Sequence, residues 1–355
     1  MKMSRKLICL VVAVIGVISL LAIEFGYAAS DLKPAPTPAP VPTKPIELKF
    51  ATHIPPVAKL IQGWTEWGKK VEQLSNGRLK ITVYPAGSLV PYTAQYPSLM
   101  DGTVDITMLH SRLVPTWYFE EVMSVPMLDW TIENRMAIRF ELEKAYPKIT
   151  EGRNKEVKTL FRGMNSLSTM MTRGKEIKVP DDIKGMIFTG SVEKGDLIEA
   201  CGGKAEFLGP PDWYTSLERG VIDGISVTYD AANASKVLDV VKYIYHMPYI
   251  TRSYNVVMNK KAWDNLPADL KQIVETTAAE VEKADLDRMD WEAAYAKVKA
   301  DGKIKMYSPT PQEIALWKDK AVPVREAILK DIAGKGFAAK EGFDAMLKVM
   351  AAHKK

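Results

Sequence analysis

From residue 46 onward, segments with β-strand patterning alternate with segments whose apolar residues recur at helical spacing. Ile46–Thr52 and Arg78–Tyr84 alternate apolar and polar residues, and Val57–Leu74 between them has helical spacing. A helix near Thr93–Met100 and a strand at Val104–Leu109 follow. Because strands that alternate with helices favour a mostly parallel sheet covered by helices, the sequence predicts an α/β fold.

A second unit of the same order begins near Ser166. Two similar α/β units in one chain predict two lobes with a cleft between them. The second unit has predicted strands at Leu167–Thr172, Met186–Phe188, Ala205–Leu208 and Ile225–Thr228, and predicted helices at Val192–Ala200 and Asp212–Leu217.

The last third of the chain is predicted to be helical. Pro267–Lys299 predicts one long helix, with Pro267 near the first turn, where a missing N–H costs little. Residues 311–332 and 339–352 predict two further amphipathic helices. We expect the Met and Trp residues of these helices to pack in the core.

The N-terminus has the pattern of a secretory signal. A basic segment, Met1–Lys6, precedes 17 apolar residues, Leu7–Ile23, and Ala28 ends a cleavage site with small residues. Residues 1–28 are therefore predicted to be a signal peptide. An uncleaved membrane anchor is the alternative, since 17 apolar residues are marginal for spanning a bilayer. Residues 29–45 form a Pro-rich linker, expected to be an extended spacer.

The net charge bears on which partners the chain can bind, and the number of cysteines bears on whether it can form a disulfide bond. The chain carries a formal net charge of +5, of which the signal peptide holds +2, which leaves +3 for the remainder. No block of Lys and Arg interleaved with aromatic residues occurs, so we expect no nucleic-acid partner. After the signal peptide only Cys201 remains, and without a basic neighbour it is expected to be a buried structural thiol.

Catalytic and metal-binding motifs are missing from the sequence. The four histidines are scattered without metal-binding spacing, and neither a Gly-rich phosphate loop nor a G-x-S-x-G nucleophile motif occurs. The sequence therefore predicts no catalytic residue and no resident metal or cofactor. A secreted enzyme is the least favoured of the functions considered for this fold.

Candidate binding residues follow the predicted strands. Open α/β sheets bind ligands at the carboxyl ends of their strands, so polar and aromatic side chains there predict a site for a small polar or aromatic solute. In the first unit these are His53, Tyr92, Gln95, His110, Ser111 and Arg112, and in the second Thr169, Thr189, Trp213, Ser226, Tyr229 and Asp230.

Six short phrases, in this order from Ile46 to about Arg288, resemble a known family. That family is the solute-binding proteins of tripartite ATP-independent periplasmic (TRAP) transporters, of the dicarboxylate-binding (DctP) type. The phrases are Asn76–Leu89 (NGRLKITVYPAGSL), Met100–Ile106 (MDGTVDI), Val125–Leu128 (VPML), Pro180–Gly185 (PDDIKG), Tyr214–Gly224 (YTSLERGVIDG) and Ala262–Pro267 (AWDNLP).

The resemblance implies a fold and a function. The fold is a two-lobe periplasmic-binding-protein-like α/β fold, with crossing strands, a helical C-terminus and a long helix that spans both lobes, which Pro267–Lys299 would form. Lobe I would comprise 46–165 plus about 250–290, and lobe II 166–249 plus about 291–355. The implied function is capture of a small organic solute in the interlobe cleft, in the periplasm, and delivery to the membrane permease subunits of a TRAP transporter. A solute-sensing binding protein for a membrane receptor is the alternative.

The sequence departs from the family at the expected ligand arginine. After the Pro180–Gly185 phrase the family usually has a strand arginine that forks onto a substrate carboxylate, and Thr189 occupies that position here. The family's "QENP" phrase after Gly224 is also replaced, by Ile225–Thr228.

Two kinds of solute are therefore compatible with the sequence. In the first, Arg112 binds an organic acid, with Arg162 and Arg252 behind it; the acid is slightly favoured because the family favours acids. A Ca²⁺ ion that bridges solute and protein stays open. In the second, the solute is neutral, aromatic or cationic. It would be held by stacking on Trp213 and Tyr229, by hydrogen bonds to Thr189 and Ser226, and by the charge of Asp230.

Overall fold

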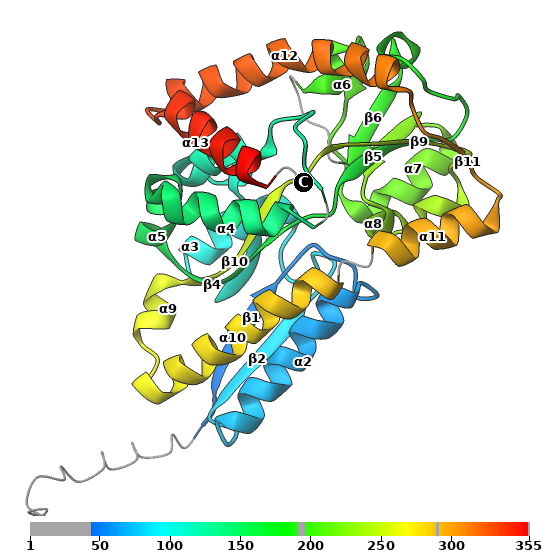
Figure 1. The fold of residues 1–355 in the computed structure, drawn as a ribbon. Helices are drawn as coiled ribbons and strands as arrows, with labels where there is room; N and C mark the ends of the chain where they lie inside the picture. Colours follow the sequence, from blue (N-terminus) through cyan, green and yellow to red (C-terminus); the bar gives the residue numbers. More distant parts are fainter. Residues whose placement is uncertain (1–43, 132, 191–195, 289–290, 354–355) are drawn as a thin grey trace, which may run out of the picture. The chain divides into compact units, whose positions relative to one another are not determined.

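Two mixed β-sheets form the framework of the protein (Figure 1). The computed structural model describes residues 44–131, 133–190, 196–288 and 291–353, without the side chains of 286–288 and 292. The predicted signal peptide and all but the last two residues of the predicted linker lie outside the described residues.

The first sheet has five strands in the order β2-β1-β3-β10-β4. Strands β1, β2 and β3 are parallel, as predicted, whereas β10 lies antiparallel between β3 and β4. On β1, Phe50 stacks on Trp64 of helix α2 with ring centroids 5.1 Å apart, which anchors the helix on the sheet. The bounds are β1 Ile46–Ala51, α2 Lys59–Leu74, β2 Leu79–Tyr84, α3 Gln95–Met100, β3 Ile106–His110, β4 Val157–Met164 and β10 Ser253–Asn259.

The second sheet has six strands in the order β11-β9-β5-β8-β6-β7. Strand β5 pairs antiparallel with β8 and β9, while β6 runs parallel to β7 and β8. Its core holds Cys201, and burial raises the pKa of this thiol to about 12, so the thiol stays protonated. The bounds are β5 Ser168–Thr172, β6 Ile187–Gly190, α6 Leu197–Ala200, β7 Lys204–Ala205, α7 Trp213–Arg219, β8 Gly224–Val227, α8 Tyr229–Ala234, β9 Tyr243–Ile250 and β11 Lys305–Tyr307.

The chain crosses between the sheets in two neighbouring segments. One joins β4 to β5 through residues 165–167, and the other joins β9 to β10 through residues 251–252. The Asn165 N–H donates to the Arg252 carbonyl (2.8 Å), and the Thr251 hydroxyl donates to the Asn165 carbonyl (2.7 Å). These bonds hold the two crossings together, and we call the sheets with their own helices the first and second lobe.

Helices also connect the lobes. In place of the single predicted helix Pro267–Lys299 there are α10 (Ala268–Arg288), which packs on α2, and α11 (Trp291–Asp301), which packs on α8. Residues 289–290 between them are not described. Helix α12 (Pro311–Gly334) runs over both lobes, as Figure 1 shows: Trp317 enters the core of the second lobe, and Ile332 enters an apolar cluster with the helices that follow β3.

The last helix differs from the predicted division of the chain. Helix α13 (Ala339–Ala352) packs on the 3₁₀ helix η3 (Pro115–Ser124) and on α4 (Arg135–Ala145), whereas the family resemblance implied that about 291–355 belong to lobe II. The physical reason is a close approach at Gly342: a Cβ there would lie 2.5 Å from the Phe119 ring, so the missing side chain lets α13 reach η3.

A buried ionic network holds the helices of the first lobe on its sheet. Arg139 of α4, with no exposed side-chain surface, bonds Glu143 at 2.9 Å and the Tyr254 carbonyl of β10 at 2.8 Å. Arg153, from α5 (Glu151–Glu156), bonds Glu120 at 2.7 Å. These arginines hold the pKa of Glu143 at about 2 against the opposing effect of burial. Charges paired in this way are costly to break singly.

Candidate functional site

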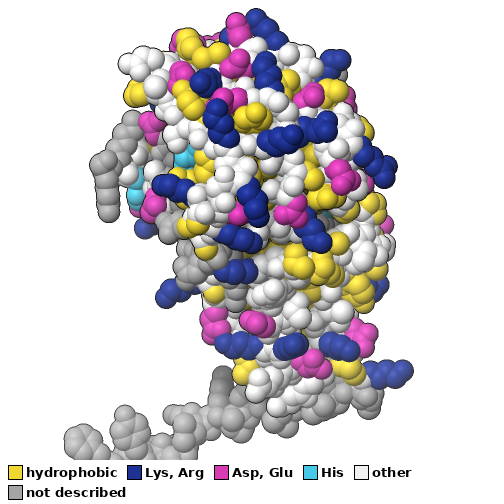
Figure 2. Space-filling model, turned by 90° about the vertical axis from the view of Figure 1, so that its right-hand side faces the viewer, with side chains coloured by type: hydrophobic (Ala, Val, Ile, Leu, Met, Phe, Trp, Pro, Cys, Tyr) yellow, Lys and Arg dark blue, Asp and Glu magenta, His cyan; other side chains and the backbone are white. Residues whose placement is uncertain are grey.

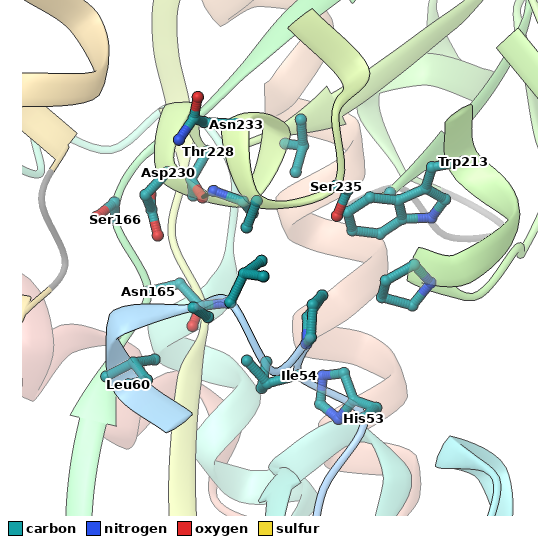
Figure 3. A pocket seen from close by; sticks show the side chains of 18 of the residues that line it. His53, Ile54, Leu60, Asn165, Ser166, Trp213, Thr228, Asp230, Asn233 and Ser235 are labelled. Atoms are coloured by element: carbon teal, nitrogen blue, oxygen red, sulfur yellow. Dashed lines mark hydrogen bonds between the residues drawn. The ribbon is translucent and has the colours of Figure 1, made fainter. Parts of the chain in front are cut away.

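A cavity of about 940 Å³ lies where residues after the strands of both lobes meet (Figure 3). His53 follows β1 and His110 ends β3 in the first lobe, Asn165 and Arg252 come from the two crossings, and Trp213 begins α7 in the second lobe. This is the edge of an α/β sheet at which ligands bind. Much of the lining is apolar and includes Ile54, Val57, Leu60, Met108, Leu113, Phe207, Leu208 and Val227.

Three rings form the wall of the cavity in the first lobe. The ring centroids of His53 and Tyr92 are 4.3 Å apart, and the Tyr92 hydroxyl lies 2.8 Å from Nδ1 of His110. Burial lowers the pKa of His53 to about 4 and that of His110 to about 3. Both imidazoles are therefore neutral at pH 7, and they present polar atoms without charge.

Two arginines supply positive charge to the cavity. Arg112 lies in the 3₁₀ helix η2 (Ser111–Leu113), and Arg252 lies in a crossing segment. Their guanidiniums are 3.8 and 3.7 Å from the same carboxylate, that of Glu121, which also accepts a 2.6 Å hydrogen bond from Ser111. Both arginine charges also act on Asp196, whose pKa burial raises to about 7.

Aromatic side chains of the second lobe cover another part of the cavity. The Trp213 Nε1–H donates to the Leu208 carbonyl (2.9 Å), which fixes the indole at the wall. Phe207, in the same loop and 60% exposed, stacks on Tyr92 of the first lobe with ring centroids 6.0 Å apart. The Tyr92–Phe207 pair thus joins the lobes at the cavity.

Some polar atoms that line the cavity are buried without a hydrogen bond among the described residues. They are Nδ1 of His53, Oγ of Ser166 and Oδ1 of Asp230. Ser166 is 1% exposed, and Asp230 lies in the first turn of α8 (Figure 3). Burial raises the pKa of Asp230. A buried polar atom without a partner is costly, so these three atoms are open to a ligand.

The structure brings six of the twelve predicted binding residues to the cavity. Four others, Thr169, Thr189, Ser226 and Tyr229, are buried outside its lining. Those that line it are His53, Tyr92, His110, Arg112, Trp213 and Asp230.

The four remaining side chains are engaged in packing the second lobe. The Thr169 hydroxyl bonds the Tyr245 carbonyl, and Ser226 Oγ lies 2.5 Å from the Tyr249 hydroxyl. The Tyr229 hydroxyl lies 2.9 Å from Nδ1 of His246. Thr189 Oγ1 accepts from the Leu208 N–H at 3.0 Å. Thr189 and Ser226 lie near the carboxyl ends of β6 and β8, whereas Thr169 lies near the start of β5 and Tyr229 begins α8. All four side chains are buried within the second lobe.

Sequence reasoning gave little weight to the crossing segments. Ser166 and Asn165 line the cavity but were not candidates, and Arg252 was placed only behind Arg112. Phe207 was not singled out either, because it falls inside the predicted strand Ala205–Leu208, whereas the observed strand β7 ends at Ala205 and leaves Phe207 in the loop that follows. Two further candidates, Gln95 and Ser111, are buried and do not line the cavity.

The distribution of surface charge bears on nucleic-acid binding, and the grouping of His, Cys, Asp and Glu side chains bears on metal binding. On the face drawn in Figure 2, basic and acidic side chains are interspersed, so that face has no continuous basic stripe of the kind used to bind nucleic acids. Within the described ranges, no three His, Cys, Asp or Glu side chains are grouped so as to hold a metal ion.

Comparison with known proteins identifies the family. Residues 50–331 match the model of the bacterial extracellular solute-binding proteins, family 7. The chain belongs to this family. The predicted resemblance to TRAP solute-binding proteins is thereby confirmed, and so is the two-lobe α/β fold. Members of this family bind small solutes and work with membrane TRAP permeases.

Individual relatives agree with this family assignment. The C4-dicarboxylate-binding periplasmic protein DctP of Rhodobacter capsulatus is 24% identical over 84% of this chain and 91% of its own. A marine metagenome TRAP protein specific for aromatic acid ligands has a TM-score of 0.77 at 19% identity, over 87% of this chain and all of the other. A Rhodoferax ferrireducens TRAP protein solved with copurified benzoate has a TM-score of 0.74 at 22% identity, over 87% and 98%.

The solute-binding proteins of this family are periplasmic. In the part of the chain that the structure describes, no helix is both long enough and apolar enough to cross a bilayer.

Proposed function

We propose that this family 7 protein binds a small organic acid in the cavity, outside the cytoplasmic membrane, and delivers it to the membrane subunits of a TRAP transporter. The observation that carries the proposal is the pair of guanidiniums, Arg112 and Arg252, at an otherwise largely apolar cavity. Two guanidiniums at one cavity suit a solute carboxylate, because an Arg–carboxylate contact is strong and directional.

The character of the cavity favours an acid with an apolar body. Trp213 and the aliphatic lining suit an aromatic or aliphatic acid better than a short dicarboxylate. Two of the similar structures support this: one protein is specific for aromatic acid ligands, and the other copurified with benzoate. The Rhodobacter capsulatus relative is named for C4-dicarboxylates, so succinate belongs in the test.

A cationic or neutral aromatic solute is the second candidate. It is favoured by one observation, the carboxylate of Asp230 in the same cavity as the indole of Trp213. In this case a positive group would lie beside Asp230, and the arginines would contribute little.

Binding to purified protein separates these candidates. Native mass spectrometry reveals a copurified solute, and calorimetric titration with succinate, benzoate, phenylacetate and choline, with and without Ca²⁺, tests the classes. We expect an acid to bind and Arg112→Ala to weaken it about tenfold to a hundredfold, the range for a hydrogen bond to a charged group. Arg219→Ala removes an exposed guanidinium that does not line the cavity and should leave affinity unchanged.

Two outcomes would count against the acid. Unchanged affinity in both Arg112→Ala and Arg252→Ala would remove the arginine pair from the site, and binding of choline alone would favour the second candidate. Delivery to a transporter is checked in the genome, since a TRAP system requires membrane subunits encoded nearby, whereas a receptor gene there would favour the sensing role.

A further inference from the structure

We infer that the solute is a carboxylate whose apolar body also carries a hydrogen-bond donor, a hydroxyl or an amino group, and that Asp230 and Ser166 bind this donor. The inference rests on the proposed function and deepens it. It gives the cavity a second polar pole, distinct from the arginine pair, and so defines the substrate class more narrowly than an organic acid.

Two unpartnered atoms from different elements form this pole. Asp230 Oδ1 comes from the first turn of α8, and Ser166 Oγ comes from the crossing between β4 and β5. Both are buried at the cavity lining, and neither has a hydrogen bond from any described residue. Burial raises the pKa of this carboxyl, whereas hydrogen bonds from the Thr228 hydroxyl and from the Asp230 and Ala231 N–H groups, and the charge of Arg135, favour its ionised form. An ionised carboxylate oxygen only accepts, so in that form its partner on the solute is a donor; the serine hydroxyl can accept from the same group or donate to it.

Asp230 and the arginine pair lie on different elements of the cavity wall. Asp230 is in α8 of the second lobe, Arg112 is in η2 of the first lobe, and Arg252 is in the crossing between β9 and β10. A solute carboxylate gains at a guanidinium and gains nothing at the Asp230 carboxyl, which favours one orientation of the solute.

The surface that these groups share is apolar. Side chains such as Leu60, Val227 and the ring of Trp213 line the same cavity, so the part of the solute between its two polar ends meets little that can hydrogen-bond. A short dicarboxylate would leave this surface uncovered and would bring a second negative charge toward Asp230. An aromatic acid with a ring hydroxyl satisfies both ends and the surface between them.

A series of matched ligands tests the second pole. Phenylacetate, its 2-, 3- and 4-hydroxy derivatives and the corresponding methoxy compounds are titrated into the full-length protein by calorimetry. A methoxy oxygen accepts but cannot donate, so we expect one hydroxy isomer to bind about tenfold tighter than phenylacetate and its methoxy counterpart to lose that gain. The three isomers place the hydroxyl at three different distances from the carboxylate, so that one of them can match the distance between the arginine pair and Asp230.

Variants assign the effect to Asp230. Asp230→Ala should abolish the preference for the hydroxy isomer, so that this isomer and its methoxy counterpart bind with equal affinity. Asp239→Ala, an exposed carboxylate of the same lobe outside the cavity lining, should retain the preference. If Asp230→Ala does not fold, Ser166→Ala and the ligand series on the unaltered protein still decide.

The outcomes separate this inference from the proposed function. Equal affinities for phenylacetate and all its hydroxy and methoxy derivatives, or a hydroxyl preference that survives Asp230→Ala, would overturn the second pole while an acid-binding site stands. If aliphatic acids bind in place of aromatic ones, hydroxy acids are compared with the matching acids that lack the hydroxyl. A hydroxyl preference that is lost in Asp230→Ala supports the inference, and equal affinities contradict it. If no acid binds at all, the proposed function fails, and this inference fails with it.

Discussion

Thr189 shows how one residue can lose a charge and gain a structural role. The family resemblance leads one to expect an arginine at this position, yet the Thr189 hydroxyl accepts the Leu208 N–H (3.0 Å). The Leu208 carbonyl in turn accepts from Trp213 (2.9 Å). Thr189 therefore anchors the loop that carries Phe207 and positions the indole at the cavity wall, although it does not line the cavity itself.

Replacing Thr189 should act on binding through this loop. Thr189→Val keeps the shape and removes the acceptor, which leaves the Leu208 N–H without its partner. We expect the free energy of unfolding to fall by about 1–3 kcal/mol in urea titrations. Solute affinity should fall as well, because Phe207 and Trp213 lose their support. Thr276→Val, on an exposed threonine of α10, is the matched control and should change neither; a Thr189 variant with normal affinity would contradict the role of the loop.

His110 makes the stability of the protein depend on pH. Burial lowers the pKa of His110 to about 3, whereas an unfolded histidine titrates near 6.5. Between pH 6.5 and about 3, His110 binds a proton in the unfolded chain and stays neutral in the folded chain. The free energy of unfolding therefore falls as the pH drops from 6.5 toward 3. We expect this fall to be less steep in His110→Asn, measured by urea unfolding at several pH values between 7 and 4. Equal slopes in the two proteins would show that His110 is not buried in its neutral form.

Among the elements, the close contact between α13 and η3 determines where the C-terminus packs. The Phe119 ring beneath Gly342 is itself held between Phe337, stacked at 5.4 Å, and Tyr146, edge-on at 5.8 Å. Gly342→Ala would put a methyl carbon 2.5 Å from that ring. We expect a loss of about 1–3 kcal/mol in the free energy of unfolding, as for other overpacked cores.

The control for this substitution lies in the neighbouring helix. In Gly334→Ala, at the end of α12, the added methyl meets nothing within 4 Å. That variant should be neutral or more stable by up to about 1 kcal/mol, since alanine favours a helix over glycine. Thermal unfolding of both variants measures the difference, and equal midpoints would show that α13 does not approach η3 so closely.

Elements with a local periodicity were predictable from the sequence, and those defined by distant partners were not. Strand β1 and helix α2 each have one apolar and one polar face, which sequence periodicity reveals. Strand β10 is buried on both sides and has no alternation, so its place between β3 and β4 could not be seen in advance. The 3₁₀ helix η3 shows no periodic signal either, because tertiary contacts determine its conformation.

The candidate site was predictable to the same limited extent. Sequence order identified the strand ends, but it could not tell which side chains there face the cavity. Ser226 and Asp230 lie four residues apart, yet Ser226 bonds Tyr249 inside the lobe, and Asp230 lines the cavity. The crossing residues Asn165 and Arg252 come together only because two distant segments pair. Such pairings depend on the whole fold.

At the scale of the whole molecule, the Tyr92–Phe207 stack links the two lobes at the cavity. We expect Phe207→Ala to speed release of a bound acid by about threefold to tenfold in stopped-flow experiments, since an aromatic pair contributes about 0.5–1.5 kcal/mol beyond its buried area. The exposed Phe207 ring contributes little to the cores, so the unfolding midpoint should stay unchanged.

Val221→Ala provides the comparison for release. Val221 is 59% exposed in the same lobe and does not line the cavity, so its loss should leave the release rate as it is. A Phe207 variant that releases solute at the original rate would mean that the stack does not hold the lobes together.

The position of β10 has a consequence for how the chain folds. The first sheet cannot be completed until β10 inserts between β3 and β4, and β10 follows all of β5 to β9 in the chain. The sheet of the first lobe can therefore be completed only after the strands β5 to β9 of the second lobe have been synthesised. Pairings between residues so distant in the sequence slow folding, because the entropy cost of closing a long loop comes before the contacts that offset it. A fragment that ends before residue 253 should leave the sheet of the first lobe without its fourth strand and fail to form that lobe.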